Sequence, residues 1–297
     1  MLKKSVTIIG CGYIGRKLIP LLLARNLLKQ SNIRTLVSSQ ESREQCLQLG
    51  VSSVCYNLDQ PDMDDKLLSK SLCSNNSILY YFAPPPSQGK KDTRVTHFLQ
   101  QITPSFTKVV LISTTGVYGN CEGQWVNEEH PLNPEVDRAY RRVDAEQQFQ
   151  DYCHTFNIPL VILRVSGIYG SGKLPLKRIR AKIPIVREED SPFSNRIHTD
   201  DLLEICIKAG FFDQIEGIFN CSDGHPTTMC DYFNKVARAV NLPEPPKISL
   251  QQASTQLSAG RLSYMHESRR IDNTKLLLHF KLLLKYPDLD KGLAHLD

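Results

Sequence analysis

The sequence predicts an α/β fold, in which the strands of a doubly wound parallel sheet alternate with helices that cover both faces. Short β-branched runs such as residues 6–9 alternate with helical stretches such as 16–26. The connections are short, which implies right-handed crossovers between parallel strands. A glycine-rich turn at 10–15 joins the first of these strands to the first helix.

Composition places the chain among globular proteins. It has 297 residues, a net charge of +5, 41% hydrophobic residues and 23% charged residues. That charge is too small to indicate nucleic acid as a partner. The nine cysteines are scattered and form no C-x-x-C pair, so we expect reduced thiols in a cytoplasmic protein, without a metal site. Without an apolar run of 18 residues, no membrane span is expected.

The elements follow in order along the chain. Strands are expected at 6–9, 33–37, 51–56, 77–82, 108–112 and 159–164. Helices are expected at 16–26, 40–49, 66–72, 95–102 and 139–152. Beyond residue 170 the alternation breaks, and a helix from about 200, a strand at 217–220 and a helix at 228–240 follow.

The turn Gly10-Cys11-Gly12-Tyr13-Ile14-Gly15 has the G-x-G-x-x-G pattern between strand and helix that marks a dinucleotide-binding site. Gly10 permits the tight turn, Gly12 lets a pyrophosphate approach the backbone, and Gly15 allows close packing of helix on strand. The helix N-terminus supplies N–H groups and partial positive charge. We therefore expect a Rossmann-type dinucleotide-binding domain at 1–165 and a smaller substrate lobe at 166–297, which can interleave with the sheet.

The end of the second strand bears on which dinucleotide binds. A carboxylate there would hold the ribose 2′-OH, whereas Ser and Arg suit a 2′-phosphate. Ser38 and Ser39 end this strand, Arg43 follows one turn later, and the first acid is Glu41. The pattern favours NADP over NAD, although a polar turn with no ligand preference would give the same residues.

Other strand ends are also expected to line the cofactor, because ligands of doubly wound sheets bind at the carboxyl ends of the strands. A triple proline stops the fourth strand and forces a stiff loop. The residues expected at the cofactor are Asn57, Leu58, Ala83, Pro84, Ser113, Val165, Ser166 and Ile168.

Taken together, these motifs resemble the extended and atypical short-chain dehydrogenases/reductases, the NAD(P)-dependent nucleotide-sugar epimerase/dehydratase-like proteins. The resemblance covers nearly the whole chain. It rests on the order and spacing of the glycine turn, Asn57-Leu58-Asp59, residues 113–119, the Glu128-x-x-Pro131-x-x-Pro134 loop, residues 163–170, Ile197-His198-x-x-Asp201 and Arg270-Ile271-Asp272-Asn273-x-Lys275.

The resemblance implies an activity and a site. Thr114 would polarise the reacting oxygen of a sugar or nucleotide-sugar. A tyrosine would act as general acid/base, with a lysine one helical turn later lowering its pKa. It also implies that the chain can form a homodimer.

The helix at 139–152 departs from this pattern in either of two registers. If Tyr140 is the acid/base, Asp144 stands where lysine belongs. If Glu146 is matched to a later acidic position of the family, Arg138 and Arg142 replace the tyrosine and lysine. The registers differ by about 200° around the helix, so only one can apply. We expect Tyr140 or Arg142 beside Thr114 in an altered site.

Remaining residues have plainer interpretations. His198 is expected to be a packing residue rather than a catalytic base. Asp201 is expected to cap a helix or to orient neighbouring groups. Cys11 has no second cysteine near it in the sequence, which argues against redox sensing. The basic segment 173–187 is expected to be solvated, or to hold substrate phosphates.

Two functions follow from the sequence. The first is an NAD(P)-dependent oxidoreductase or epimerase/dehydratase-like enzyme acting on a sugar or nucleotide-sugar. The second is a catalytically weak or inactive NAD(P)-binding regulatory or scaffold protein, which the missing lysine favours.

Overall fold

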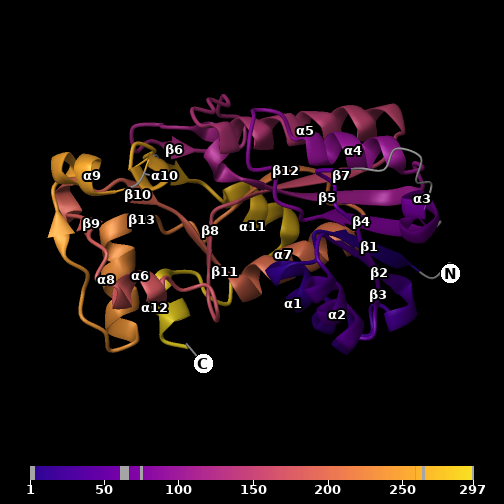
Figure 1. Cartoon of the computed structure of the whole chain (residues 1–297), viewed down its shortest axis with the longest axis horizontal. Helices are drawn as coiled ribbons and strands as arrows, with labels where there is room; N and C mark the ends of the chain where they lie inside the picture. The colour runs from indigo at the N-terminus through magenta and orange to yellow at the C-terminus, as the bar shows by residue number, and fades with distance from the viewer. Residues whose placement is uncertain (1–3, 61–66, 74–75, 258, 263–264, 296–297) are drawn as a thin grey trace. The chain divides into compact units, whose positions relative to one another are not determined.

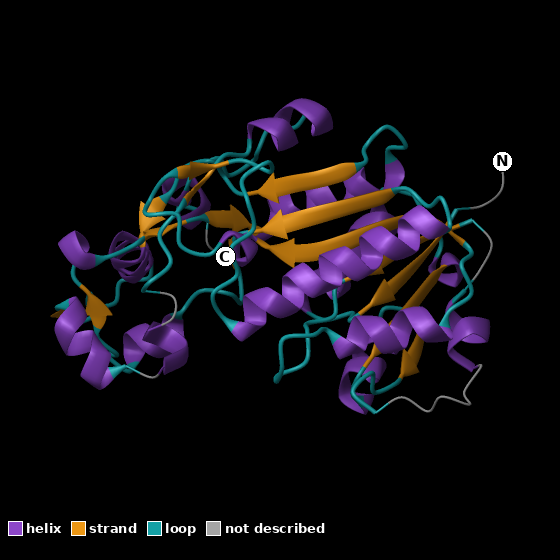
Figure 2. Ribbon diagram, turned by 90° about the horizontal axis from the view of Figure 1, so that it is seen from above, coloured by secondary structure: helices purple, strands orange, loops and turns teal. Residues whose placement is uncertain are grey.

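The computed structural model describes residues 4–60, 67–73, 76–257, 259–262 and 265–295. Its largest sheet has seven strands in the order β12-β7-β5-β4-β1-β2-β3 (Figures 1 and 2). These strands are β1 (Ser5–Ile9), β2 (Ile33–Val37), β3 (Ser52–Cys55), β4 (Ser77–Tyr81), β5 (Phe106–Thr114), β7 (Leu160–Val165) and β12 (Gly217–Cys221). The chain order reverses between β1 and β4, which is the topological switch point of a doubly wound sheet.

The longer helices connect these strands. They are α1 (Tyr13–Ala24), α2 (Gln40–Gln48), α3 (Leu67–Leu72), α4 (Thr93–Gln101), α5 (Asp137–Thr155) and α7 (Thr199–Phe211). Helices α4 and α5 lie on one face of the sheet, and α1 and α2 lie on the other (Figure 1). The predicted α/β fold with a doubly wound sheet is therefore confirmed.

Strand β4 shows why the sheet needs helices on both faces. All five of its residues are buried. Successive side chains point to opposite faces. The Tyr81 ring packs against Phe98 of α4 and Phe149 of α5, with centroids 5.5 and 5.0 Å away. Tyr80 points the other way and donates a hydrogen bond to the Cys206 carbonyl of α7, at 3.0 Å.

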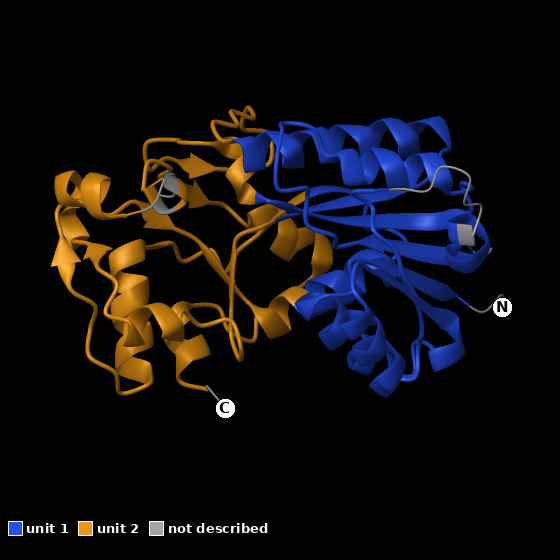
Figure 3. Cartoon of the chain, in the orientation of Figure 1, with its two compact units in different colours: residues 1–114, 137–164, 203–218 blue, residues 115–136, 165–202, 219–297 orange. Residues whose placement is uncertain are grey.

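The chain folds into two compact units (Figure 3). Unit 1 comprises residues 1–114, 137–164 and 203–218, and unit 2 comprises 115–136, 165–202 and 219–297. The predicted boundary at 165 is one of the points where the chain passes between units. The units interleave, because residues 115–136 belong to unit 2 and 203–218 to unit 1.

Unit 2 is built from short elements. Its strands are β6 (Trp125–Val126), β8 (Gly167–Tyr169), β9 (Ile185–Val186), β10 (Phe193–Ser194), β11 (Arg196–His198), β13 (Thr227–Thr228), β14 (Lys247–Ile248) and β15 (Arg270–Ile271). Its helices are α6 (Leu176–Arg180), α8 (Met229–Ala239), α9 (Leu250–Gln256), α10 (Ala259–Leu262), α11 (Thr274–Phe280) and α12 (Leu289–Leu293). Among the described residues, the 3-10 turns are η1 (Gln30–Asn32), η2 (Thr115–Tyr118) and η3 (Glu188–Asp190).

The strands expected from the sequence correspond to those of the central sheet, with shifted ends. Strand β5 spans 106–114 where 108–112 was expected, and α5 spans 137–155 where 139–152 was expected. The expected helix 66–72 corresponds to α3, although residue 66 lies outside the described residues. No helix within the described ranges is long and apolar enough to cross a membrane.

Candidate dinucleotide site

The glycine turn is shaped by the backbone of the neighbouring strand end. Gly10 has φ +77°, and a Cβ there would stand 2.4 Å from the Ala83 backbone. Only glycine fits such a position without moving the loop after β4. A Cβ on Gly15 would stand 3.0 Å from the Cys11 sulfur and 3.2 Å from Ile8, so this glycine lets α1 pack closely on β1.

Gly12 differs from the other two glycines because the protein leaves space beside it. A Cβ there would meet only the Gly10 carbonyl oxygen, at 3.8 Å. Gly12 is the N-cap of α1, no side chain caps this helix, and its first turn contains no acidic residue. An exposed helix N-terminus of this kind attracts an anion. The turn therefore fits the pyrophosphate of a dinucleotide.

The end of β2 exposes two hydroxyl groups, and no carboxylate directly follows the strand. Ser38 and Ser39 are both exposed. Ser39 caps α2 by accepting a hydrogen bond from the Ser42 amide at 3.2 Å. Arg43, half-buried on α2, donates from Nε to the Ser53 carbonyl at 3.3 Å. This arginine therefore packs against β3 through one of its nitrogens.

The loops after β3 and β4 are joined by a residue that sequence reasoning missed. Arg94 forms two hydrogen bonds with Asp59, at 2.7 and 2.6 Å, and donates to the Pro84 carbonyl at 2.9 Å. The guanidinium holds the pKa of Asp59 below its usual value. The segment with Asn57 and Leu58 and the segment with Ala83 and Pro84 are thus fixed to each other. The sequence carried no signal for this link beyond Asp92, whose position before α4 is typical of an N-cap.

Glu146 determines how α5 is rotated. Its carboxylate accepts hydrogen bonds from Arg164 Nη2 at 2.8 Å and from Ser113 Oγ at 2.5 Å. The Glu146 and Arg164 side chains are each 3% exposed. Ser113, which was expected at the cofactor, therefore donates its hydroxyl hydrogen to the carboxylate of this buried ion pair. Thr114 follows at the end of β5 and is partly buried.

Arg142 lies one helical turn before Glu146. Its Nη1 is 3.4 Å from the carbonyl oxygen of Ala83, the residue against which Gly10 packs. Burial lowers the pKa of Arg142, while Asp92, Tyr81 and Glu146 oppose the shift. An arginine keeps its proton near neutral pH even so. The chain thus places a fixed positive charge next to the loop that borders the glycine turn.

Tyr140 lies elsewhere on the helix. The Lys90 ammonium stands 4.3 Å from the centre of its ring. Asp144, one turn later, pairs with Lys91 at 2.9 Å and accepts from the Asp92 amide at 2.8 Å. The face of α5 with Tyr140 and Asp144 therefore contacts residues 90–92, which lead into α4. The register in which Arg138 and Arg142 replace tyrosine and lysine stays a prediction.

Three predicted cofactor residues belong to unit 2. Val165 is 5% exposed, and Ser166 bonds to the Cys221 carbonyl through both its amide at 3.0 Å and its hydroxyl at 2.9 Å. Ile168 pairs with Ile197 in the ladder of β8 and β11. His198 stacks against Tyr286 with ring centres 3.9 Å apart, which gives it a packing role. Asp201 accepts hydrogen bonds from the amides of Lys285 and Tyr286.

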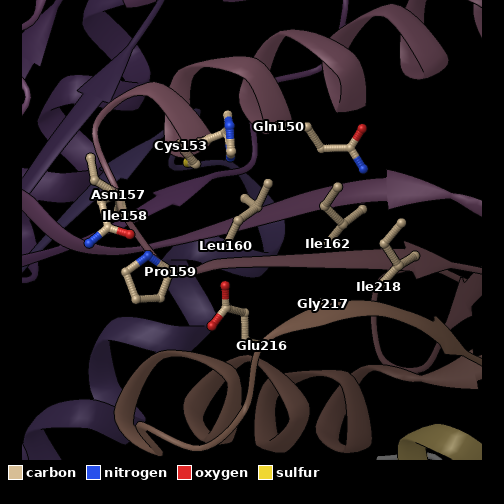
Figure 4. Close-up of a pocket in the computed structure, with 11 residues that line it drawn as sticks. Gln150, Cys153, Asn157, Ile158, Pro159, Leu160, Ile162, Glu216, Gly217 and Ile218 are labelled. Carbon is tan, nitrogen blue, oxygen red and sulfur yellow. The ribbon is translucent and has the colours of Figure 1, made fainter.

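Unit 1 also contains a cavity of about 410 Å³ (Figure 4). It lies between the end of α5, the beginning of β7 and the beginning of β12. Leu160, Ile162 and Ile218 line it together with polar residues such as Gln150 and Glu216. Ligands of such sheets bind at the carboxyl ends of the strands, whereas this cavity is at the opposite end of β7. It is therefore not the dinucleotide site.

No group of three or more His, Cys, Asp or Glu side chains suited to a metal ion occurs within the described ranges. The doubly wound fold and the glycine turn are features of the dinucleotide-binding α/β proteins.

Comparison with known proteins shows which proteins this chain is similar to. Residues 88–191 match the NAD dependent epimerase/dehydratase family. A dTDP-D-glucose 4,6-dehydratase of Dictyostelium discoideum is 24% identical over 165 residues, which are 48% of this chain and 37% of that protein. The chain thus matches little more than a third of that relative's length.

Solved structures match over the whole chain. A functionally unknown conserved protein from Silicibacter pomeroyi DSS has 26% identity and a TM-score of 0.82, with 99% of this chain and 98% of that one covered. The UDP-glucuronic acid 4-epimerase from Bacillus cereus, in complex with NAD, has 15% identity and a TM-score of 0.74, with 98% and 97% covered. These structures show the shared fold, and the match of residues 88–191 to the NAD dependent epimerase/dehydratase family agrees with the resemblance expected from the sequence.

Proposed function

We propose that the protein binds a nicotinamide dinucleotide and acts as an oxidoreductase or epimerase/dehydratase-type enzyme on a sugar or nucleotide-sugar. The glycine turn carries the cofactor part, because its geometry leaves room for a ligand only beside Gly12. The substrate class is supported by the names of the similar proteins, which act on dTDP-D-glucose and UDP-glucuronic acid. A cytoplasmic homodimer stays a prediction.

The dinucleotide would be held by residues at the ends of the strands, and when bound it supplies hydride transfer. In unit 1 these residues are Gly10, Gly12, Tyr13, Ile14, Gly15, Ser38, Ser39, Arg43, Asn57, Leu58, Ala83 and Pro84. The cofactor role expected of Val165, Ser166 and Ile168, which belong to unit 2, stays a prediction. Ser113, also predicted at the cofactor, donates its hydroxyl to Glu146.

NADP is the proposed form of the cofactor. Two exposed hydroxyls and Arg43 follow β2, and the first acid after the strand, Glu41, lies in the first turn of α2. Ser and Arg side chains suit a 2′-phosphate. Two observations favour NAD instead: Arg43 already donates to Ser53, and the Bacillus cereus epimerase contains NAD. Direct titration decides between them.

The chemistry of the site rests on Thr114 and Arg142. The Thr114 hydroxyl can donate a hydrogen bond to a substrate oxygen, and the Arg142 cation can stabilise negative charge that develops nearby. Neither group accepts a proton at neutral pH, because the guanidinium is already protonated and a threonine hydroxyl is a very weak base. The usual proton relay of the family is therefore altered.

A second candidate function is favoured by the same replacement. With Arg138 and Arg142 in place of tyrosine and lysine, the chain can be an NAD(P)-binding regulatory or scaffold protein without turnover. The two candidates share the dinucleotide and differ only in whether bound NADPH or NADH is oxidised by a carbonyl substrate.

The first experiment is a titration of the protein with NADPH and NADH, followed by thermal unfolding and nicotinamide fluorescence. A dinucleotide at 100 times its Kd raises the free energy of unfolding by about 2.7 kcal/mol. NADPH is expected to bind more tightly than NADH, and Arg43→Ala is expected to reduce that preference. If neither dinucleotide stabilises the protein, both candidate functions are wrong.

Turnover is then tested with Thr114→Val, which keeps the shape of the side chain and removes its hydroxyl. Turnover with sugar and nucleotide-sugar carbonyl compounds is expected to fall by about 100-fold or more, while NADPH affinity stays within about twofold. Thr114→Ser, the matched control, should restore most of the rate. Equal rates for the wild type and Thr114→Val would remove Thr114 from the mechanism.

A further inference from the structure

The cavity of about 410 Å³ in unit 1 lies between the end of α5 and the edge of the large sheet. The chain turns back after α5 at Asn157, whose φ is +53°, and the Ile158 amide donates to the Cys153 carbonyl at 2.8 Å. The edge strand β12 begins at Gly217, where a Cβ would meet no heavy atom within 4 Å. The side of the cavity formed by this strand is therefore open where β12 begins.

The floor of the cavity is apolar and belongs to the core of unit 1. Ile158, Leu160 and Ile162 are 9%, 8% and 1% exposed, and Ile218 packs against the same core. Figure 4 shows the side chains of Leu160, Ile162 and Ile218 pointing from the strands toward α5. A cavity of this size with an apolar floor is typical of sites for small molecules.

The rim of the cavity is polar and carries a negative charge. Among the described residues that line it, Glu216 is the only carboxylate, and none is Lys or Arg. Glu216 is exposed, and Figure 4 shows its side chain turned toward Pro159 and Leu160. Within the parts of the chain that the structure describes, this carboxylate forms no ion pair and accepts no hydrogen bond.

The charge of Glu216 also acts inside the cavity. Burial raises the pKa of the lining Cys153 thiol to about 12, and the Glu216 carboxylate adds to the rise. Lys108 feels the same charge, but it does not line the cavity, and its Nζ donates to the Phe212 carbonyl at 2.6 Å. The Glu216 carboxylate is thus available to a cation from outside the chain.

We propose that this cavity is a second ligand site, which binds a small organic cation made of an apolar body and a protonated amine. The body covers Leu160, Ile162 and Ile218, and the ammonium group pairs with Glu216. Covering the apolar floor supplies most of the affinity. The exposed ion pair adds less and selects the charge of the ligand. The proposal does not depend on the dinucleotide or on the proposed function.

The test compares three probes that share one apolar body and differ in the charge of the head group. They are 4-phenylbutylamine, 4-phenyl-1-butanol and 4-phenylbutyrate, which are cationic, neutral and anionic at pH 7. Each is titrated into the full-length protein labelled with ¹⁵N, and the backbone amide shifts are followed by NMR. We expect shifts at residues 153–162 and 216–218. The amine should bind about threefold more tightly than the alcohol, and more tightly still than the acid.

Two variants of the exposed Glu216 test the role of its charge. Glu216→Gln is expected to weaken amine binding to the level of the alcohol, and Glu216→Lys to make the acid bind more tightly than the amine. If Glu216→Lys does not fold, Glu216→Gln decides alone. Glu44→Gln and Glu44→Lys are the matched controls, because Glu44 is exposed on α2, on the other face of the sheet. Both should keep the wild-type order of the probes.

Four results would overturn the proposal. The first is that none of the three probes binds. The second is equal binding of all three, which would show an apolar pocket without a preference for charge. The third is a set of amide shifts centred outside the cavity, for example on the glycine turn. The fourth is an unchanged preference for the amine in Glu216→Gln.

Discussion

Glu146 and Arg164 form a buried ion pair, and its main effect is to fix the rotation of helix α5. Arg164 also donates from Nε to both Glu146 oxygens, at 3.3 and 3.2 Å, so the two groups meet in a fixed plane. Such a pair adds little net stability compared with apolar residues, but losing one partner leaves an unpaired buried charge. Its consequence is positional, because it turns α5 so that Arg142 lies at the Ala83 loop.

Glu146→Gln is therefore expected to lower the free energy of unfolding by about 3 to 5 kcal/mol, since it strands the Arg164 charge. Urea denaturation measures this. Glu244→Gln is the matched control, because Glu244 pairs with the exposed Arg238 and its loss should cost less than about 1 kcal/mol. Equal losses in both variants would mean that burial does not decide the strength of these pairs.

At the scale of an element, the turn from β1 to α1 contains one glycine that folding needs and another that ligand binding needs. Gly10 is needed because Ala83 occupies the space of a side chain, whereas the protein leaves room beside Gly12. The same residue type thus serves two purposes two positions apart.

Substitution of the two glycines by alanine should separate these purposes. Gly10→Ala is expected to lower the free energy of unfolding by more than about 2 kcal/mol, because of its positive φ and the contact with Ala83. Gly12→Ala should leave stability within about 1 kcal/mol and weaken NADPH binding by at least tenfold. Chemical denaturation and fluorescence titration measure the two effects. Strong binding by Gly12→Ala would place the pyrophosphate elsewhere.

Helix α5 shows what an element's own sequence leaves open. Its composition predicts a polar helix, and its length follows well enough from residues 139–152. Its rotation does not, because Tyr140 and Arg142 both have polar neighbours that could face a ligand. Contacts with β5, β7 and the loop before α4 decide it, and all of them come from residues distant in sequence.

At the scale of the molecule, stability depends on buried charges as well as on the core. Asp223 in unit 2 is 3% exposed. Its burial raises its pKa to about 7, opposed by the hydrogen bond from the His225 amide and by the charges of His225 and Arg196, while Asp288 adds to the rise. In the unfolded chain this carboxyl titrates near pH 4.

This difference predicts a pH dependence. Below about pH 4 the folded and unfolded states both hold the proton. Between about pH 4 and 7 only the folded state holds it, so stability falls as pH rises, and above about pH 7 the loss is complete. The difference in the free energy of unfolding between the wild type and Asp223→Asn should thus decrease by about 2 to 4 kcal/mol as the pH rises across that interval. Denaturation of both proteins at several pH values measures it, and a flat difference would show that Asp223 titrates normally.

Local pattern was sufficient for the sheet and for the glycine turn. Residues 6–9 are buried on both sides because every strand of such a sheet needs apolar residues, and the turn after them needs Gly10 for its positive φ. These constraints act between near neighbours in the chain, so they can be recognised from the order of residue types. The family resemblance followed from the same local motifs.

The partners of the site's polar groups depended on the fold alone. Ser113, expected at the cofactor, donates its hydroxyl to Glu146, and Arg94 links two loops that no motif connects. Hydrogen bonds and ion pairs reach only a few ångströms, so they depend on which distant segments the packing brings together. Local periodicity specifies which residues are buried, while the contacts between elements decide which buried polar groups meet.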